Sequence, residues 1–129
     1  MKTQNIRVKL RDGEMSAYLA IPDKTPAAAV IAIMEIWGVN DTMRHHAHEF
    51  AEAGFICLVP DLFWRQEPGV ALSDGDPEHV KKAFDLYYDF DYDLGVRDVE
   101  DIRHYLTESR NAAARSERLA TVSAASSAI

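Results

Sequence analysis

An acidic residue follows the most apolar stretch of the sequence. Residues 27–34 read AAAVIAIM, and Glu35 comes directly after them, before Ile36, Trp37 and Gly38. A carboxylate at the end of a core strand is costly to desolvate unless a nearby group needs it. Two interpretations of Glu35 therefore stand: an acid exposed at a strand end, or part of a site.

A second group of candidate residues lies shortly after it. In RHHAHE, residues 44–49, His45, His48 and Glu49 are spaced i, i+3, i+4, which places them on one face of a helix. Three such groups could hold zinc. Their order matches neither H-E-x-x-H nor its inverted form, so we expect this face to be solvated. A metal-binding module on helix 41–53 remains the alternative.

Cys57 is the only cysteine. It stands inside the apolar run FICLVP without a glycine turn beside it, which is typical of a small core residue rather than a nucleophile. A single cysteine also excludes an intrachain disulfide and fits a reducing compartment.

Composition narrows the class of protein. The 129 residues carry a net charge of −7, with 47% hydrophobic and 27% charged residues, as expected of one globular domain. The acidic balance argues against nucleic acid or anionic membrane as a partner. The N-terminus lacks the apolar core of a signal peptide, and no run reaches membrane-spanning length. We expect a cytoplasmic protein.

The order of elements predicts an α/β fold. Residues 5–10 alternate apolar and polar, Asp12-Gly13 is a hairpin-turn signal, and residues 15–22 return as a second strand. Residues 27–34 and 55–59 are continuously apolar, as in strands covered on both faces. Between them, residues 41–53 predict a helix capped by Asn40 or Asp41 and closed by Gly54, with an apolar stripe of Met43, Ala47, Phe50 and Ala51.

Residues 60–77 predict a long loop that lines or covers a site. A helix then begins with Asp76 as cap and Pro77 at its first position. Its expected apolar face holds Val80, Phe84 and Tyr87, and that of the next helix holds Val99, Ile102 and Leu106.

The composition changes near residue 110. Residues 111–129 hold seven alanines and four serines, without glycine or aromatic residues. We divide the chain into a domain over 1–110 and an aberrant tail over 111–129, with a residual strand at 118–122.

Three stretches resemble the dienelactone hydrolase (carboxymethylenebutenolidase) family, a branch of the α/β-hydrolase fold. They are MEIWGVNDTMR, AGFICLVPDLFWRQEPGVAL and FDYDLGVRDVEDIRHYL, between about residues 28 and 107. The resemblance covers the N-terminal half, or slightly more, of such a domain.

The resemblance implies a mechanism. Members use a cysteine nucleophile on a sharp turn between strand and helix, with a histidine base and an aspartate that orients it. Carried over by position, Glu35 corresponds to the glutamate that helps to form the thiolate, and Ile36 supplies an oxyanion-hole N–H. Trp37 is expected to form a wall of the substrate pocket.

The sequence departs from the family at two places. Where a member can present an arginine to a substrate carboxylate, this chain has Val80, followed by Lys81 and Lys82. Lys81 and Phe84 are the expected substrate-binding residues here, but a lysine lacks the arginine's bidentate fork. The family's glycine-rich nucleophile turn aligns with residues 123–128, which place Ala125 at the nucleophile.

These observations together predict a partial α/β-hydrolase fold, an N-terminal hairpin followed by parallel strands with packed helices, truncated or frame-shifted before the nucleophile elbow. We expect a dienelactone-hydrolase-like ester or lactone hydrolase, inactive as this chain because the nucleophile, aspartate and histidine are missing. A non-catalytic remnant is the rival interpretation. The expected partner is a small ester or lactone, without metal or other cofactor, and an uncovered sheet edge predicts self-association.

Overall fold

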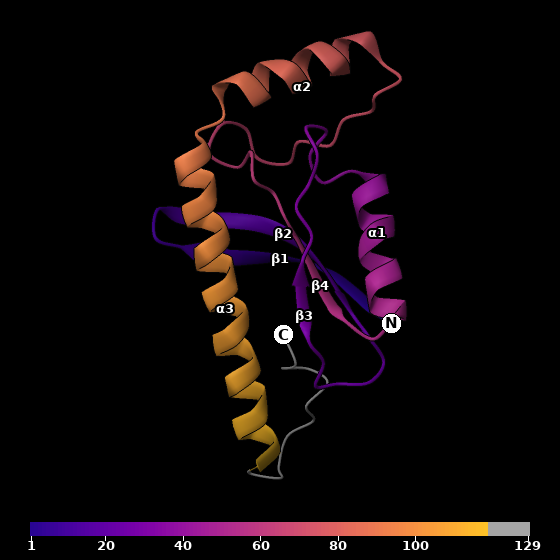
Figure 1. The fold of residues 1–129 in the computed structure, drawn as a ribbon, viewed down its shortest axis with the longest axis vertical. Helices are drawn as coiled ribbons and strands as arrows, with labels where there is room; N and C mark the ends of the chain where they lie inside the picture. Colours follow the sequence, from indigo (N-terminus) through magenta and orange to yellow (C-terminus); the bar gives the residue numbers. More distant parts are fainter. Residues whose placement is uncertain (119–129) are drawn as a thin grey trace.

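The computed structural model describes the backbone of residues 1–118 and the side chains of residues 1–109. It contains four strands and three helices in this part of the chain (Figure 1). They are β1 (Lys2–Leu10), β2 (Gly13–Ile21), β3 (Ala29–Ile31), α1 (Asp41–Glu52), β4 (Ile56–Pro60), α2 (Pro77–Asp89) and α3 (Tyr92–Arg118).

The strands form one mixed sheet in the order β1-β2-β4-β3. β1 pairs with β2, and β2 with β4, in antiparallel orientation, whereas β3 and β4 are parallel. The crossover from β3 to β4 passes through α1, as the apolar runs on either side of this helix predict. The predicted α/β class, with a hairpin followed by parallel strands, is confirmed.

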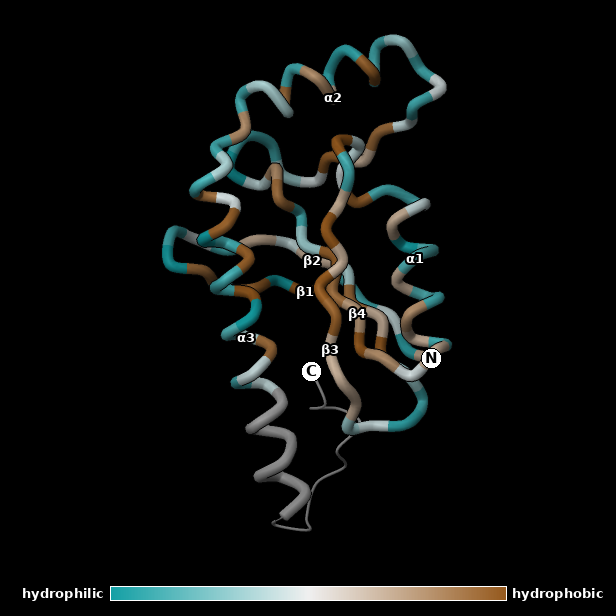
Figure 2. Tube along the Cα trace, in the orientation of Figure 1, coloured by the Kyte–Doolittle hydropathy of each residue, from teal (hydrophilic) through white to brown (hydrophobic). Residues whose placement is uncertain are grey.

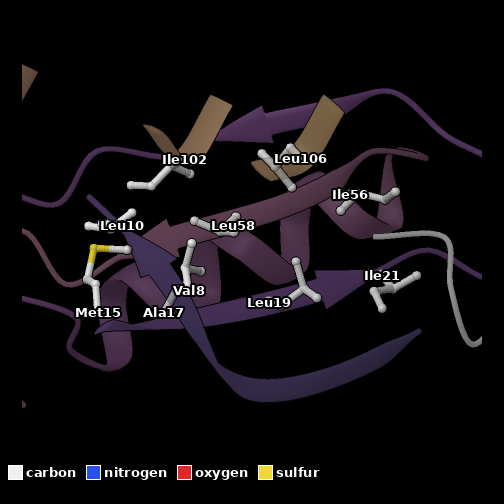
Figure 3. Packing of buried hydrophobic residues seen from close by; sticks show 10 residues of the cluster. All are labelled: Val8, Leu10, Met15, Ala17, Leu19, Ile21, Ile56, Leu58, Ile102 and Leu106. Carbon is white, nitrogen blue, oxygen red and sulfur yellow. The ribbon is translucent and has the colours of Figure 1, made fainter. Parts of the chain in front are cut away.

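Each face of the sheet carries one helix. Residues that alternate along β2 and β4 point to opposite sides, so Leu19 and Leu58 pack toward α3, while Ala20 and Val59 pack toward α1. Figure 3 shows the cluster that includes Ile102 and Leu106 of α3. Figure 2 shows that hydrophobic residues are concentrated along β3 and β4. The predicted core contacts of α3 are therefore confirmed for Ile102 and Leu106, whereas Val99 is half-buried and lies outside this cluster.

The hairpin turn lies one residue earlier than predicted. Leu10 pairs with Gly13, which leaves Arg11 and Asp12 as the turn residues. Gly13 begins β2 with φ +152°, and a Cβ built there would lie 3.1 Å from the Trp64 ring. Glycine is needed at this position because the indole packs against the start of the strand.

β3 is shorter and less buried than its sequence predicts. It contains three half-buried residues, Ala29–Ile31, and Ile33 beyond it is 52% exposed. The continuous apolar run of residues 27–34 predicted a strand covered on both faces. In the described part of the chain β3 instead occupies the sheet edge and pairs with β4 only.

The ends of α1 and α2 agree with the predicted caps, but their apolar stripes agree only in part. Asn40 caps α1 and Asp76 caps α2 through side-chain oxygens. Phe50 of α1 is 38% exposed and packs edge-on against Phe55 rather than joining the core. In α2 the buried residue is Ala83, whereas Phe84 and Tyr87 are exposed.

The reason for the difference in α2 is its position. Figure 1 shows α2 away from the sheet, above the loop that precedes it. Ala83 packs against Phe63, Val70 and Leu72 of that loop. A helix that rests on a loop buries a narrower stripe than one that rests on a sheet.

The same loop is fixed to the rest of the molecule by buried polar contacts. Asp98 of α3, 1% exposed, accepts hydrogen bonds from Trp64 Nε1 at 3.0 Å and from Arg65 at 2.7 and 3.0 Å. Arg65 also reaches Asp12 at 2.7 Å, and its hydrogen bond holds the pKa of the Asp12 carboxyl below the ordinary value. Arg97 pairs with Asp12 as well, at 2.8 Å. Arg65 therefore joins the hairpin turn, the loop and α3.

Two of the predictions from sequence concern the C-terminal end of the chain. α3 continues to Arg118, across the proposed boundary between residues 110 and 111. Of the expected strand at 118–122, residues 119–122 lie outside the described residues. In the described part of the chain, no helix combines the length and apolar character needed to span a membrane.

Candidate active site

The acidic residue that follows β3 opens a tight turn. The Gly38 amide donates to the Glu35 carbonyl at 3.1 Å, with Ile36 and Trp37 as the two central residues. Gly38 has φ +80°. A turn of this kind leaves the amides of its central residues without an internal acceptor. Within residues 1–118, neither the Ile36 nor the Trp37 amide donates to another backbone carbonyl.

Residues 70–72 hold this turn from the other side. The Val39 amide donates to the Val70 carbonyl at 3.1 Å, and the Leu72 amide donates to the Trp37 carbonyl at 2.8 Å. A Cβ on Gly38 would lie 2.1 Å from the Val70 carbonyl oxygen, so the two segments approach more closely than any side chain permits. We call residues 70–72 the clamp.

Asn40 joins the clamp to α1. Its Oδ1 accepts from the Met43 amide at 3.1 Å, which caps the helix, while its Nδ2 donates to the Leu72 carbonyl at 3.0 Å. One side chain thus fixes the turn, the clamp and the helix N-terminus relative to one another. Backbone hydrogen bonds to the clamp and the side chain of Asn40 together place the turn.

A pocket of about 370 Å³ opens beside the turn. Glu35 and Trp37 line it on one side, Leu72 and Asp74 on another, and His79 at the first turn of α2 completes it. The arrangement combines a solvent-accessible carboxylate, free backbone donors and an indole wall. The backbone donors of such a set can stabilise an oxyanion that forms on a bound carbonyl group, and the carboxylate can accept a proton.

Comparison with known proteins identifies the family. Residues 15–122 match the dienelactone hydrolase family. The chain belongs to that family. A Pseudomonas putida carboxymethylenebutenolidase is 35% identical over 106 residues, which are 81% of this chain and 45% of the relative. A protein of Azospirillum brasilense, described provisionally as a carboxymethylenebutenolidase, is 46% identical over 83 residues. These residues are 64% of this chain and 36% of the relative.

A solved structure supports the fold. A protein of Klebsiella pneumoniae, described provisionally as a dienelactone hydrolase, superposes with a TM-score of 0.68 at 23% identity. The match covers 81% of this chain and 42% of that one. The observed sheet is therefore part of an α/β-hydrolase-like fold, as predicted. The chain spans less than half the length of the relatives named here.

The structure brings only some of the predicted site residues together. Glu35 and Trp37 line the same pocket, and the amide of Ile36 lies in the turn between them, while its side chain packs into the Phe63 cluster. The two residues predicted on α2 lie elsewhere. Lys81 is exposed and pairs with Asp85 at 3.0 Å, and Phe84, which is 42% exposed, stacks on Tyr88.

Three residues of the candidate site were not predicted. His79 and Asp74 line the pocket, and Asn40 was expected only as a cap. For His79, the available sequence signal was its place in the first turn of the helix that Asp76 caps, directly after the loop predicted to line a site. The Asn40 amide contact gives no local signal, since its acceptor is 32 residues away.

The histidine constellation on α1 is not assembled. His48 turns toward β2, where its Nε2 lies 2.6 Å from the Tyr18 hydroxyl oxygen. His45 and His46 instead approach Glu49, at 3.5 and 3.3 Å. Among the described side chains, no three His, Cys, Asp or Glu residues converge as metal ligands. The expectation that all three groups face water was wrong for His48, because it is half-buried against Tyr18.

Cys57 is a core residue. It is fully buried in β4, and burial raises the pKa of its thiol to about 11. A thiol in this environment stays protonated at neutral pH and is a poor nucleophile. The interpretation of Cys57 as a small apolar residue is confirmed.

Proposed function

We propose that this chain supplies the oxyanion-binding half of an ester or lactone hydrolase site. The observation that carries the proposal is the Glu35–Gly38 turn, in which Glu35, Trp37 and Gly38 line one pocket and the Ile36 and Trp37 amides donate to no backbone carbonyl among the described residues. Membership of the dienelactone hydrolase family and the resemblance of the EIWG motif support the same assignment.

In the proposed reaction, a thiolate attacks the carbonyl carbon of a bound ester or lactone. The electron pair of the C=O bond moves to oxygen, and the Ile36 N–H donates a hydrogen bond to the resulting oxyanion. Glu35 takes part in generating the thiolate, because an ordinary thiol with a pKa near 8.5 is mostly protonated at neutral pH. Trp37 forms the apolar wall against which the acyl group rests.

The thiolate is not supplied by the residues that the structure describes. Their only cysteine is Cys57, which is fully buried in the central strand β4. The proposal therefore assigns to this chain the stabilisation of the oxyanion, and assigns nucleophilic attack to a segment like the C-terminal half of the relatives. By itself, this chain is proposed to be inactive.

The experiment that tests the proposal compares the chain with a completed version. Residues 1–110, joined to the C-terminal half of the Pseudomonas putida relative, should hydrolyse p-nitrophenyl acetate, while the 129-residue chain should not exceed background. In the completed enzyme, Glu35→Gln should lower kcat by about 10²- to 10⁴-fold, the range for positioned acid–base groups.

The control variant is Glu52→Gln, which removes the same charge at the far end of α1 and should leave turnover unchanged. Turnover by the isolated chain, or a completed enzyme indifferent to Glu35→Gln, would contradict the proposal. A folded but inactive completed protein would favour the non-catalytic remnant.

We also propose that the outer edge of β3 mediates self-association. Within the described residues this edge pairs with no strand, and the neighbouring Ile33 is exposed. Unpaired edges next to apolar side chains recruit further strands. Light scattering should detect dimers or larger species at micromolar concentration, and Ile33→Lys should reduce them. A monodisperse monomer across this range would refute the idea.

A further inference from the structure

The charge on the pocket walls points to a substrate class. Glu35, Asp41 and Asp74 all line the pocket beside the turn, and none of the residues that line it within the described chain is a lysine or arginine. Asp74 and Asp41 are exposed, so their field acts through solvent and is weakened by salt.

The nearby lysines are committed elsewhere. Lys81 pairs with Asp85 at 3.0 Å and Lys82 with Glu67 at 2.6 Å, and neither side chain lines the pocket. Val80 separates these lysines from His79 in the sequence, and its side chain does not line the pocket either. α2 therefore contributes no positive group to the pocket.

His79 is the residue that α2 does contribute. The Ser73 amide donates to its Nδ1 at 3.1 Å. An Nδ1 that accepts a hydrogen bond carries no proton, so Nε2 is the donor nitrogen of the ring in this arrangement. The Nε2 atom lies 3.8 Å from Asp76 Oδ2, beyond hydrogen-bond distance, so His79 offers an N–H donor in a pocket whose other ionisable walls are acidic.

We propose that the pocket walls of this chain select an uncharged ester or lactone over one that bears a carboxylate, with His79 as a specificity-determining donor. The inference rests on the proposed function, because it describes what the same pocket accepts. A carboxylate on the ligand meets the like charges of Glu35 and Asp74, while Asp41 is ion-paired with Arg44 at 3.2 Å and contributes less. An uncharged carbonyl compound meets the Trp37 face, the free amides and the His79 N–H instead.

The test measures binding to the full 129-residue chain and needs no turnover. Phenyl acetate and 4-acetoxybenzoate are matched probes that differ by one carboxylate. Titrations followed through the Trp37 indole and Gly38 amide resonances should show phenyl acetate binding at least about threefold more tightly at low ionic strength. The preference should shrink as salt is raised, because exposed charges are screened.

Two variants separate charge from shape. Asp74→Asn should reduce the preference toward unity by strengthening 4-acetoxybenzoate binding, whereas Glu52→Gln, with the same loss of charge away from the pocket, should not. His79→Ala should weaken phenyl acetate binding, and His79→Gln, which retains a side-chain donor, should restore it.

Equal or tighter binding of 4-acetoxybenzoate at low salt would overturn the inference. An unchanged preference in Asp74→Asn, or the absence of resonance shifts with both probes, would do the same. Failure of the proposed function is seen separately, as absent turnover in the completed enzyme even though the binding preference is present.

Discussion

Replacing Gly38 by alanine is expected to destabilise the protein and to disable the oxyanion-binding turn. The residue has φ +80°, and a Cβ would lie 2.1 Å from the Val70 carbonyl oxygen, so the turn and the clamp must separate. Left-handed strain together with overpacking should cost about 3–5 kcal/mol of unfolding free energy. Urea denaturation followed by circular dichroism measures this loss.

The same change should affect activity beyond its effect on stability. Separation of the clamp breaks the hydrogen bonds that place the Ile36 and Trp37 amides, and a displacement of about 1 Å at a site can lower the rate a hundredfold. We expect kcat of the completed enzyme to fall by about 10²- to 10³-fold at a temperature where the variant is folded.

Gly54→Ala is the matched control. Gly54 also has positive φ, +97°, but a Cβ there meets no atom within 4 Å. This variant should lose only about 1–2 kcal/mol from backbone strain and should retain kcat. Similar losses in both variants would show that the contact with Val70 does not matter.

Truncating Asp98 to alanine is expected to produce a loss of stability of similar size. Asp98 is almost completely buried and accepts hydrogen bonds from both Trp64 and Arg65. Its removal leaves the Trp64 N–H and the Arg65 guanidinium without this partner, and breaking a buried ion pair on one side costs about 3–5 kcal/mol. Urea denaturation, with tryptophan fluorescence as the probe, measures the change.

The comparison variant lies on the same helix. Glu108 is exposed, and its Oε1 lies 4.0 Å from His104 Nε2, so Glu108→Ala should change the unfolding free energy by less than about 0.5 kcal/mol. Asp98→Asn keeps the shape and one acceptor of the side chain. Its loss of unfolding free energy should lie between those of Asp98→Ala and Glu108→Ala. An Asp98→Ala variant within about 1 kcal/mol of the parent would contradict a structural role for this network.

The sequence by itself determined the local features of this protein. Asn40 and Asp76 are recognisable as caps because a cap depends on its own next few residues. β4 is recognisable from its continuous apolar run, and the EIWG stretch identifies the candidate site, because both are contiguous in the chain. These features need no knowledge of what packs against them.

Only the tertiary structure decided how the site is assembled. The clamp joins Trp37 to Leu72, and Asp98 holds Trp64, across separations of more than thirty residues. Whether α2 turns His79 or Lys81 toward the pocket depends on its packing against the loop before it, not on its own periodicity. Contacts between distant segments are set by the shape of the whole fold, so local sequence patterns place residues on elements but do not choose the partners of those residues.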